Sequence, residues 1–217
     1  WGRDVSPGIW ARNFLDDSGH PVERELGANT FWRFGHHTWS FGKFTHVREL
    51  IESRWITMNR GRLYLGSTPI PELTFRGGAE FGSEAIRDEQ LLDGGSPYAG
   101  WKVTPELMVT VRPLPQLTLS LNYLQRLLYT SKGGRELSNE PILRSSLRYF
   151  FTRDFSVRYV FEWTGLEDLM VNDALVRYEP SPGTVFYLRY REQTLWDSGA
   201  TLDSRSVFLK LSILFST

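Results

Sequence analysis

The stretch Val207-Phe-Leu-Lys-Leu-Ser-Ile-Leu-Phe-Ser-Thr217 ends the sequence on an alternation of side-chain type. Apolar residues share one parity and polar residues the other, namely Val207, Leu209, Leu211, Ile213 and Phe215 against Ser206, Lys210 and Ser212. Successive side chains of a β-strand point to opposite faces, so this stretch predicts a strand with one apolar face. Such a strand closes an outer-membrane β-barrel, with Phe215 at the membrane interface, or it ends a sheet of a soluble sandwich.

The same period-2 alternation recurs along the chain, and no helical pattern longer than two turns interrupts it. In Gln116–Tyr123, for example, Leu117, Leu119 and Leu121 share one parity. We therefore predict an all-β, antiparallel fold of about twelve strands. The expected strands lie near 5–15, 22–34, 38–47, 54–65, 71–84, 101–112, 115–130, 140–152, 154–164, 170–180, 183–193 and 203–216.

Short and long connections alternate between these strands. Tight, turn-forming segments stand at 112–116, 152–154 and 180–183, and further short turns are expected at 35–37 and 67–71. Longer polar segments stand between them, at 16–21, 84–100, 131–140, 165–169 and 192–205. A transmembrane β-barrel with short periplasmic turns and long outer loops produces this alternation, whereas a sandwich does not require it. The pattern favours the membrane barrel over the soluble sheet.

Composition excludes several classes of protein. The 217 residues include no cysteine, which excludes disulfides and thiolate metal sites. Lys plus Arg and Asp plus Glu each number 25, so no overall field attracts nucleic acid. No run of 18 apolar residues exists, and the mean hydropathy is -0.32, which excludes a transmembrane helix. The aromatic content of 14% suits a barrel, and it suits a soluble all-β protein as well.

Aromatic residues gather near the predicted strand ends. Interfacial anchoring predicts two aromatic belts on the lipid side of a barrel, and cross-strand aromatic pairing in any sheet is the alternative. The residues assigned to the belts are Trp39, Trp101, Tyr149, Phe151, Phe155, Trp163 and Phe215.

Charged residues occupy the other parity of the second half. We predict that this parity lines the barrel lumen through Arg144, Arg148, Arg158, Glu162, Asp173, Arg177, Arg189, Arg191 and Lys210. If Phe151 faces Phe155, and Tyr178 faces Phe186, then three pairs lie opposite each other across strands: Arg144 and Glu162, Arg148 and Arg158, and Asp173 and Arg191. Two functions stay open for these residues: a lumen that selects small polar or anionic solutes, or a salt-bridged plug that holds a narrow barrel together.

No catalytic, metal or cofactor site is expected. His36 and His37 are adjacent at a predicted turn, which favours a surface pair over convergent metal ligands. His20 and His46 have no serine or aspartate at the spacing of a nucleophilic triad. The glycine-rich segments 93–97 and 132–135 lack the strand–helix setting of a phosphate loop, and the acidic loop 84–100 lacks calcium-ligand spacing. We therefore do not expect an enzyme.

Three stretches together resemble the end of one protein family: Leu143–Arg158, Val176–Tyr190 and Val207–Ser212. This family consists of large, poorly characterised outer-membrane proteins of Gram-negative bacteria, in which a carbohydrate-binding-like sandwich precedes a C-terminal barrel. The resemblance covers about the last 80 residues, from Glu140 onward. It implies an outer-membrane barrel, no established enzymatic activity, and an N-terminal periplasmic module that is absent from this chain. It supplies no catalytic residues.

The sequence as a whole therefore predicts that residues 1–217 form an outer-membrane β-barrel, or the C-terminal part of one. Trp1-Gly-Arg-Asp4 is typical of mid-chain sequence, so a longer polypeptide is expected. The expected role is a passive, porin-like pore or a membrane anchor in the bacterial outer membrane. Its expected partners are membrane lipid and either a small polar solute or a partner protein, with no nucleic acid and no cofactor. The alternatives are a soluble all-β binding protein and, less favoured, an outer-membrane hydrolase.

Overall fold

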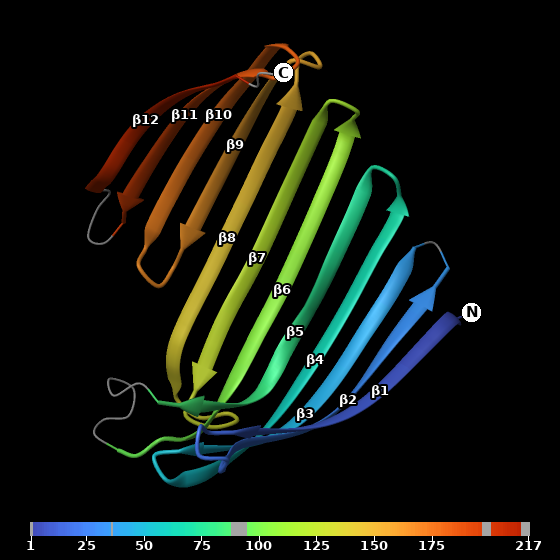
Figure 1. Cartoon of the computed structure of the whole chain (residues 1–217), viewed down its shortest axis with the longest axis vertical. Coiled ribbons are helices and arrows are strands. Elements are labelled where there is room, and N and C mark those ends of the chain that lie inside the picture. Colours follow the sequence, from blue (N-terminus) through green and yellow to red (C-terminus); the bar gives the residue numbers. More distant parts are fainter. Residues whose placement is uncertain (1, 36, 88–94, 197–200, 214–217) are drawn as a thin grey trace. The chain divides into compact units, whose positions relative to one another are not determined.

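Twelve antiparallel strands in one sheet make up the fold in the computed structural model, which describes residues 2–35, 37–87, 95–196 and 201–213 (Figure 1). Each strand is hydrogen-bonded to the next in chain order, which is the up-and-down arrangement that the alternating turns predict. The strands are β1 Gly2–Leu15, β2 Pro21–Phe34, β3 Thr38–Ile51, β4 Arg54–Ile70, β5 Leu73–Ile86, β6 Tyr98–Leu114, β7 Leu117–Tyr129, β8 Glu136–Phe150, β9 Phe155–Thr164, β10 Leu169–Ser181, β11 Thr184–Leu195 and β12 Thr201–Ile213. No helix in the described ranges is long and apolar enough to cross a membrane. The all-β class and the count of about twelve strands are confirmed.

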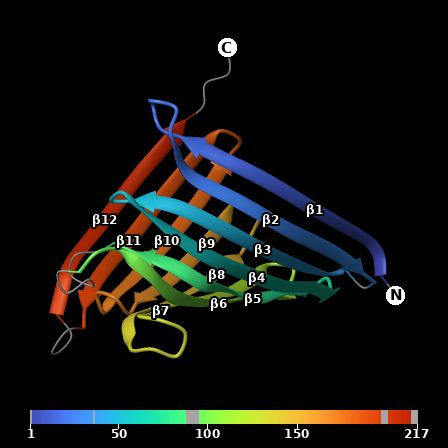
Figure 2. The same ribbon diagram turned by 90° about the horizontal axis from the view of Figure 1, so that it is seen from below.

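The chain divides into two compact units. The first comprises 1–69, 76–106 and 125–139, and the second comprises 70–75, 107–124 and 140–217. Strands β1 to β3 belong to the first unit, and they lie side by side in both views (Figures 1 and 2). Strands β9 to β12 belong to the second unit, and β4 to β8 contribute residues to both.

Register in the second unit follows the predicted turns. The amide of Phe151 donates to the carbonyl of Phe155 at 3.0 Å, and Tyr178 pairs with Phe186. The three predicted cross-strand pairs are confirmed, namely Arg144 with Glu162, Arg148 with Arg158, and Asp173 with Arg191. Alternation and turn chemistry were therefore sufficient to predict the register here.

Residues that pair directly across strands point to the same side of a sheet, so the register assigns the paired side chains of β8 to β12 to a face. The charged face carries all nine predicted lumen residues, namely Arg144, Arg148, Arg158, Glu162, Asp173, Arg177, Arg189, Arg191 and Lys210. The apolar face carries Leu147, Val157, Val176, Tyr178, Phe186, Leu188, Val207, Leu209 and Leu211.

The apolar face is more exposed than that of a water-soluble protein. On the apolar face, Leu188 is 47% exposed and Leu209 is 73% exposed. On the charged face, Asp173 is only 8% exposed. Soluble domains bury large apolar side chains and expose carboxylates unless these are paired. The apolar face of this unit is therefore left uncovered.

The first unit shows the same division. Its charged face carries Lys43 and Arg62, which are directly paired between β3 and β4. Its apolar face carries Val5 and Ile9, which are 60% and 88% exposed. Its described buried apolar cluster is small and consists of Val47, Ile56 and Met58.

Two connections differ from the predicted turns. The first is a tight turn at Glu52 and Ser53, whose φ angles of 48° and 68° suit a two-residue hairpin, although neither is glycine or asparagine. The second was expected at 67–71, but Ser67 still pairs with Thr38, their hydroxyls lie 2.7 Å apart, and β4 continues to Ile70. The predictions for His36, for Phe215 and for the middles of loops 84–100 and 192–205 fall outside the described residues.

Candidate functional site

An arginine cluster lies on the charged face of the second unit and consists of Arg148, Arg158, Arg189 and Arg191. Arg158, Arg189 and Arg191 come from the strands on either side of Asp173, and Arg148 stands directly opposite Arg158. The Nε of Arg189 donates to both carboxylate oxygens of Asp173, at 3.1 and 3.0 Å, and its Nη2 also contacts this carboxylate. Arg189 stands diagonally from Asp173, because the residue directly opposite is Arg191. Long side chains reach such diagonal neighbours. Asp173 is thus occupied by one arginine of the cluster.

The other arginines of the cluster leave donors open. The Nε atoms of Arg158 and Arg191 are buried and have no hydrogen-bond partner in the described part of the chain. Arg148 pairs directly with Arg158 across β8 and β9, which places two like charges side by side. A buried donor without an acceptor is unfavourable, so this cluster favours an added anion.

The remaining predicted lumen residues lie around the cluster on the same face. Arg144 donates to Glu162 at 3.1 Å, and Arg177 forms an ion pair with Glu179. Lys210 is exposed and pairs directly with Tyr187. Arg144 and Arg177 are therefore neutralised by ion pairs with glutamates, whereas the four arginines of the cluster share one aspartate.

An aromatic ladder crosses one end of strands β8 to β11 on the apolar face. Its centroid distances are 4.6 Å from Tyr149 to Phe151, 5.1 Å from Phe151 to Phe155, 6.4 Å from Phe155 to Tyr178 and 6.3 Å from Tyr178 to Phe186. These separations are within the range of favourable aromatic pairs. The ladder brings together three of the residues assigned to the belts and extends them along the strand ends.

Trp163 and Trp101 lie elsewhere. Trp163 pairs directly with Met170 at the opposite end of β9, on the same face as the ladder. Trp101 precedes Lys102, whose amine reaches the charged face to contact Glu80, so alternation assigns Trp101 to the apolar side. The amine of Lys132 lies 5.6 Å from the Trp101 ring.

Replacing Phe155 with alanine is expected to destabilise the folded chain by about 1–3 kcal/mol, because two ring pairs worth about 0.5–1.5 kcal/mol each are lost. Phe186→Ala, at the end of the ladder, removes one of these pairs and is expected to cost less. Denaturant unfolding of both variants in lipid vesicles gives the comparison. Equal losses would show that the ladder contacts do not determine the cost.

Trp39 departs from the predicted belt. It pairs with Arg33 and Gly66 and shares its face with Lys43 and Arg62, so it lies on the charged face of the first unit. Its neighbours there are aromatic, and they line a pocket of about 360 Å³ together with charged residues: Phe31, Trp39, Phe41, Arg62, Tyr64, Arg76 and Glu106. Sequence reasoning missed this pocket, because aromatic residues were assigned to the lipid side.

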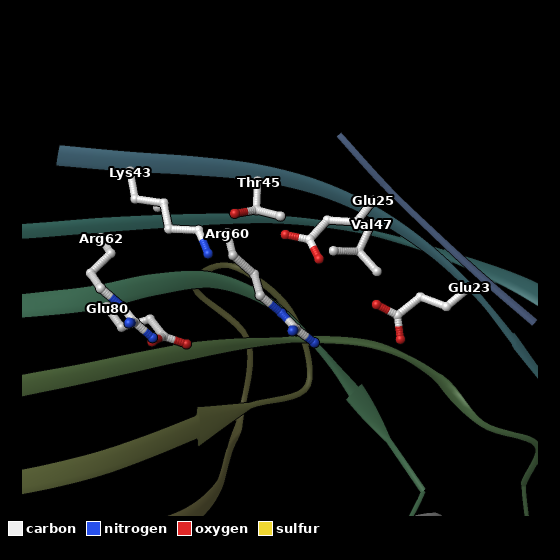
Figure 3. Close-up of a pocket in the computed structure, with 9 residues that line it drawn as sticks. Glu23, Glu25, Lys43, Thr45, Val47, Arg60, Arg62 and Glu80 are labelled. Carbon is white, nitrogen blue, oxygen red and sulfur yellow. The ribbon is translucent and has the colours of Figure 1, made fainter. Parts of the chain in front are cut away.

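A second pocket of the first unit is lined by equal numbers of acids and bases (Figure 3). Its side chains come from β2 to β5 and enclose about 180 Å³. Lys102 extends the network by contacting Glu80 at 2.9 Å and Glu84 at 3.1 Å, and Arg60 lies 3.5 Å from Glu84. These ion pairs compensate one another, so the pocket has less surplus charge than the arginine cluster.

Histidines do not form a catalytic arrangement in the ranges that the structure describes. The Nδ1 of His46 lies 2.8 Å from Oδ1 of Asn59, and His20 lies 3.7 Å from Asp16. No group of three or more metal-ligating side chains gathers among the described residues. The chemistry that the described site supports is reversible binding of charged or polar groups.

Comparison with known proteins gives structural likeness alone. No protein-family model matches the chain, and no curated protein matches it. Solved structures that align over most of the chain include the KdgM porin in complex with disordered oligogalacturonate, at 10% identity and TM-score 0.37, with 98% of both chains covered. The NanC porin aligns at 12% identity and TM-score 0.40, with 97% of this chain and 99% of that chain covered. The CymD monoaromatic hydrocarbon channel aligns at 11% identity and TM-score 0.41, with 98% of this chain and 78% of that chain covered.

Proposed function

We propose that this chain forms an outer-membrane β-barrel, or the C-terminal part of one, whose charged faces line a passive pore for small anionic solutes. The observation that carries the proposal is the uncovered apolar face of the second unit, where Leu188 and Leu209 are exposed. An aliphatic face that no other part of the protein covers is stable when it contacts lipid. Moving one such side chain out of water is worth about 1.5–3 kcal/mol.

The aromatic ladder supports the same orientation. Tyrosine and phenylalanine rings at strand ends suit the boundary between hydrocarbon and head groups. The ladder lies at the end where the connections are 151–154 and 182–183, and the connections at the other end are 165–168 and 196–200. Short turns face the periplasm in bacterial barrels. We therefore assign the Phe155 end of β9 to the periplasmic side.

A soluble binding protein is the alternative. It would require a second layer over Leu188, Leu209 and their neighbours, but the described residues form one sheet and leave these side chains exposed. A hydrolase would require a nucleophile beside His20 or His46, whose described contacts are with Asp16 and Asn59. The described residues therefore show neither the covering layer of a soluble protein nor the nucleophile–histidine contact of a hydrolase.

The arginine cluster supports selectivity for anions. Arg158 and Arg191 each present a buried Nε without an acceptor, and guanidinium groups bind carboxylate and phosphate oxygens through paired donors. Pores lined by arginine or lysine favour anions. The cluster therefore serves as a weak anion-binding site that binds and releases its anion reversibly.

Bilayer recording tests this function directly. The double variant Arg158→Gln/Arg191→Gln should conduct, with a lower permeability ratio of anion to cation. One unit charge at about 4 Å in bulk water changes the local concentration of a monovalent ion by roughly fivefold, which gives the scale of the shift expected per arginine. The reversal potential in a salt gradient measures the shift.

The matched control is Arg24→Gln/Arg205→Gln, which removes the same charge from residues of the opposite parity. This control should leave the reversal potential unchanged. An equal shift in both variants would mean that net charge, rather than the arginine cluster, sets the selectivity. Absence of conductance from the folded parent chain would contradict the pore itself.

A further inference from the structure

The aromatic pocket on the charged face of the first unit is not part of the arginine cluster. Four half-buried rings gather there, from Phe31, Trp39, Phe41 and Tyr64, over strands β2 to β4. The Phe31 and Trp39 rings are near parallel, with centroids 5.9 Å apart and an interplanar angle of 21°. Aromatic rings gathered on a face that otherwise carries charges indicate a ligand with an apolar side and polar edges.

Gly66 allows the Trp39 ring to lie against the sheet. A Cβ at Gly66 would stand 2.4 Å from Cε2 of Trp39, so any other residue would push the indole away. Gly66 is itself buried beneath the ring. The sheet therefore supports one side of the indole, and the opposite side is left to form the pocket.

Charged groups surround the rings. The guanidinium of Arg76 lies 5.9 Å from the Tyr64 ring and pairs with Glu106, and Arg62 pairs with Glu80. These side chains supply both donors and acceptors at the edge of the aromatic surface. The pocket volume of about 360 Å³ falls within the range of about 300–1,000 Å³ that is usual for small-ligand sites.

We propose that this pocket binds a pyranose ring of a linear oligosaccharide. The face of a pyranose carries C–H bonds of partial positive charge, which suit the negative face of an aromatic ring. Its equatorial hydroxyls point outward, where Arg62, Arg76 and Glu106 can donate and accept hydrogen bonds. This inference rests on the proposed function, because a dissolved sugar reaches the pocket only if the charged face lines the water-filled pore.

Trp10 provides a matched comparison within the same unit. Its ring also lies against a glycine, because a Cβ at Gly27 would stand 2.1 Å from Cζ2 of Trp10. Here, however, the indole donates to Glu25 at 2.7 Å, and the amine of Lys43 lies 4.7 Å from the ring. Side chains of the protein thus already occupy Trp10, whereas the aromatic surface at Trp39 opens into a pocket.

Calorimetric titration of the full chain, folded in detergent micelles, tests the proposal with two probes: neutral maltohexaose and an acidic hexamer of mannuronate. Both should bind. Trp39→Ala should weaken both by about tenfold or more, and Phe31→Ala should weaken both as well. Trp10→Ala should leave both affinities unchanged. Heat-modifiable gel migration confirms folding, and Phe31→Ala carries the test if Trp39→Ala does not fold.

If the chain bound neither maltohexaose nor the mannuronate hexamer, the proposal would be overturned. Mannuronate binding that survives Trp39→Ala and Phe31→Ala would also overturn it, because the ligand would then be held by charge alone. Conductance of the same preparation separates this inference from the pore. A conducting chain that binds neither sugar contradicts only the saccharide site, and a chain that binds sugar without conducting contradicts only the pore.

Discussion

Replacing Leu209 with arginine is expected to cost about 2–4 kcal/mol of folding free energy in a lipid bilayer, the largest effect of any single surface substitution considered. Leu209 is 73% exposed and lies near the middle of β12 on the apolar face. If this face meets lipid, the substitution places a cation in hydrocarbon. If the face met water, the same change at an exposed site would cost within about 0.5 kcal/mol. Denaturant unfolding in vesicles, followed by heat-modifiable gel migration, measures the difference.

The adjacent residue is the control. Phe208 is 55% exposed but points to the charged face, where it pairs with Arg189. Phe208→Arg introduces the same charge on the proposed water-filled side, with cross-strand repulsion of about 0.2–1 kcal/mol. Similar losses in Leu209→Arg and Phe208→Arg would contradict the assignment of the two faces.

Replacing Asp173 with asparagine is the second large effect that we expect. Asp173 is 8% exposed, and its carboxylate accepts two hydrogen bonds from Nε of Arg189 within the arginine cluster. The isosteric amide removes the negative charge that compensates this cluster, and its NH2 group replaces a buried acceptor with a donor that faces the Arg189 guanidinium. Loss of such a partner costs about 1–3 kcal/mol. Chemical denaturation of the folded chain in vesicles would measure it.

Glu162→Gln is the matched change. Glu162 lies on the same charged face, but its pair with Arg144 is more open, with side-chain exposures of 54% for Arg144 and 36% for Glu162. Exposed ion pairs contribute about 0–1 kcal/mol. Asp173→Asn should therefore be clearly the more destabilising of the two. Equal effects would mean that the cluster does not depend on its acid.

Strand positions and register in the second unit were predictable because each depends on local pattern. Alternation between Phe155 and Trp163 assigns the face, and a short turn such as that at 152–154 restricts which residues can pair. The hairpin at Glu52 and Ser53 was not predictable, because both residues adopt positive φ and neither is the glycine or asparagine that usually signals such a turn. Tertiary pairing of β3 with β4 imposes that conformation.

The shared face of the clustered arginines was predictable, but their contacts were not. Parity placed Asp173 and Arg191 opposite each other, whereas the carboxylate binds Arg189, because long side chains choose among direct and diagonal neighbours. The face of Trp39 could not be read from its residue type, since aromatic rings serve both lipid interfaces and pocket walls. Its neighbour Gly66 is the sequence signal that could have found this pocket.

Single-cysteine labelling along β11 tests the central claim most directly, and the absence of native cysteine makes each label unique. Leu188→Cys and Arg189→Cys, each carrying a nitroxide, would be measured in lipid vesicles with oxygen as the lipid-soluble relaxant and a nickel chelate as the aqueous one. We predict that the label at 188 responds to oxygen and the label at 189 to nickel, with the preference alternating along the strand. Preferential access of nickel to position 188 would contradict a lipid-facing apolar face, and with it the membrane barrel.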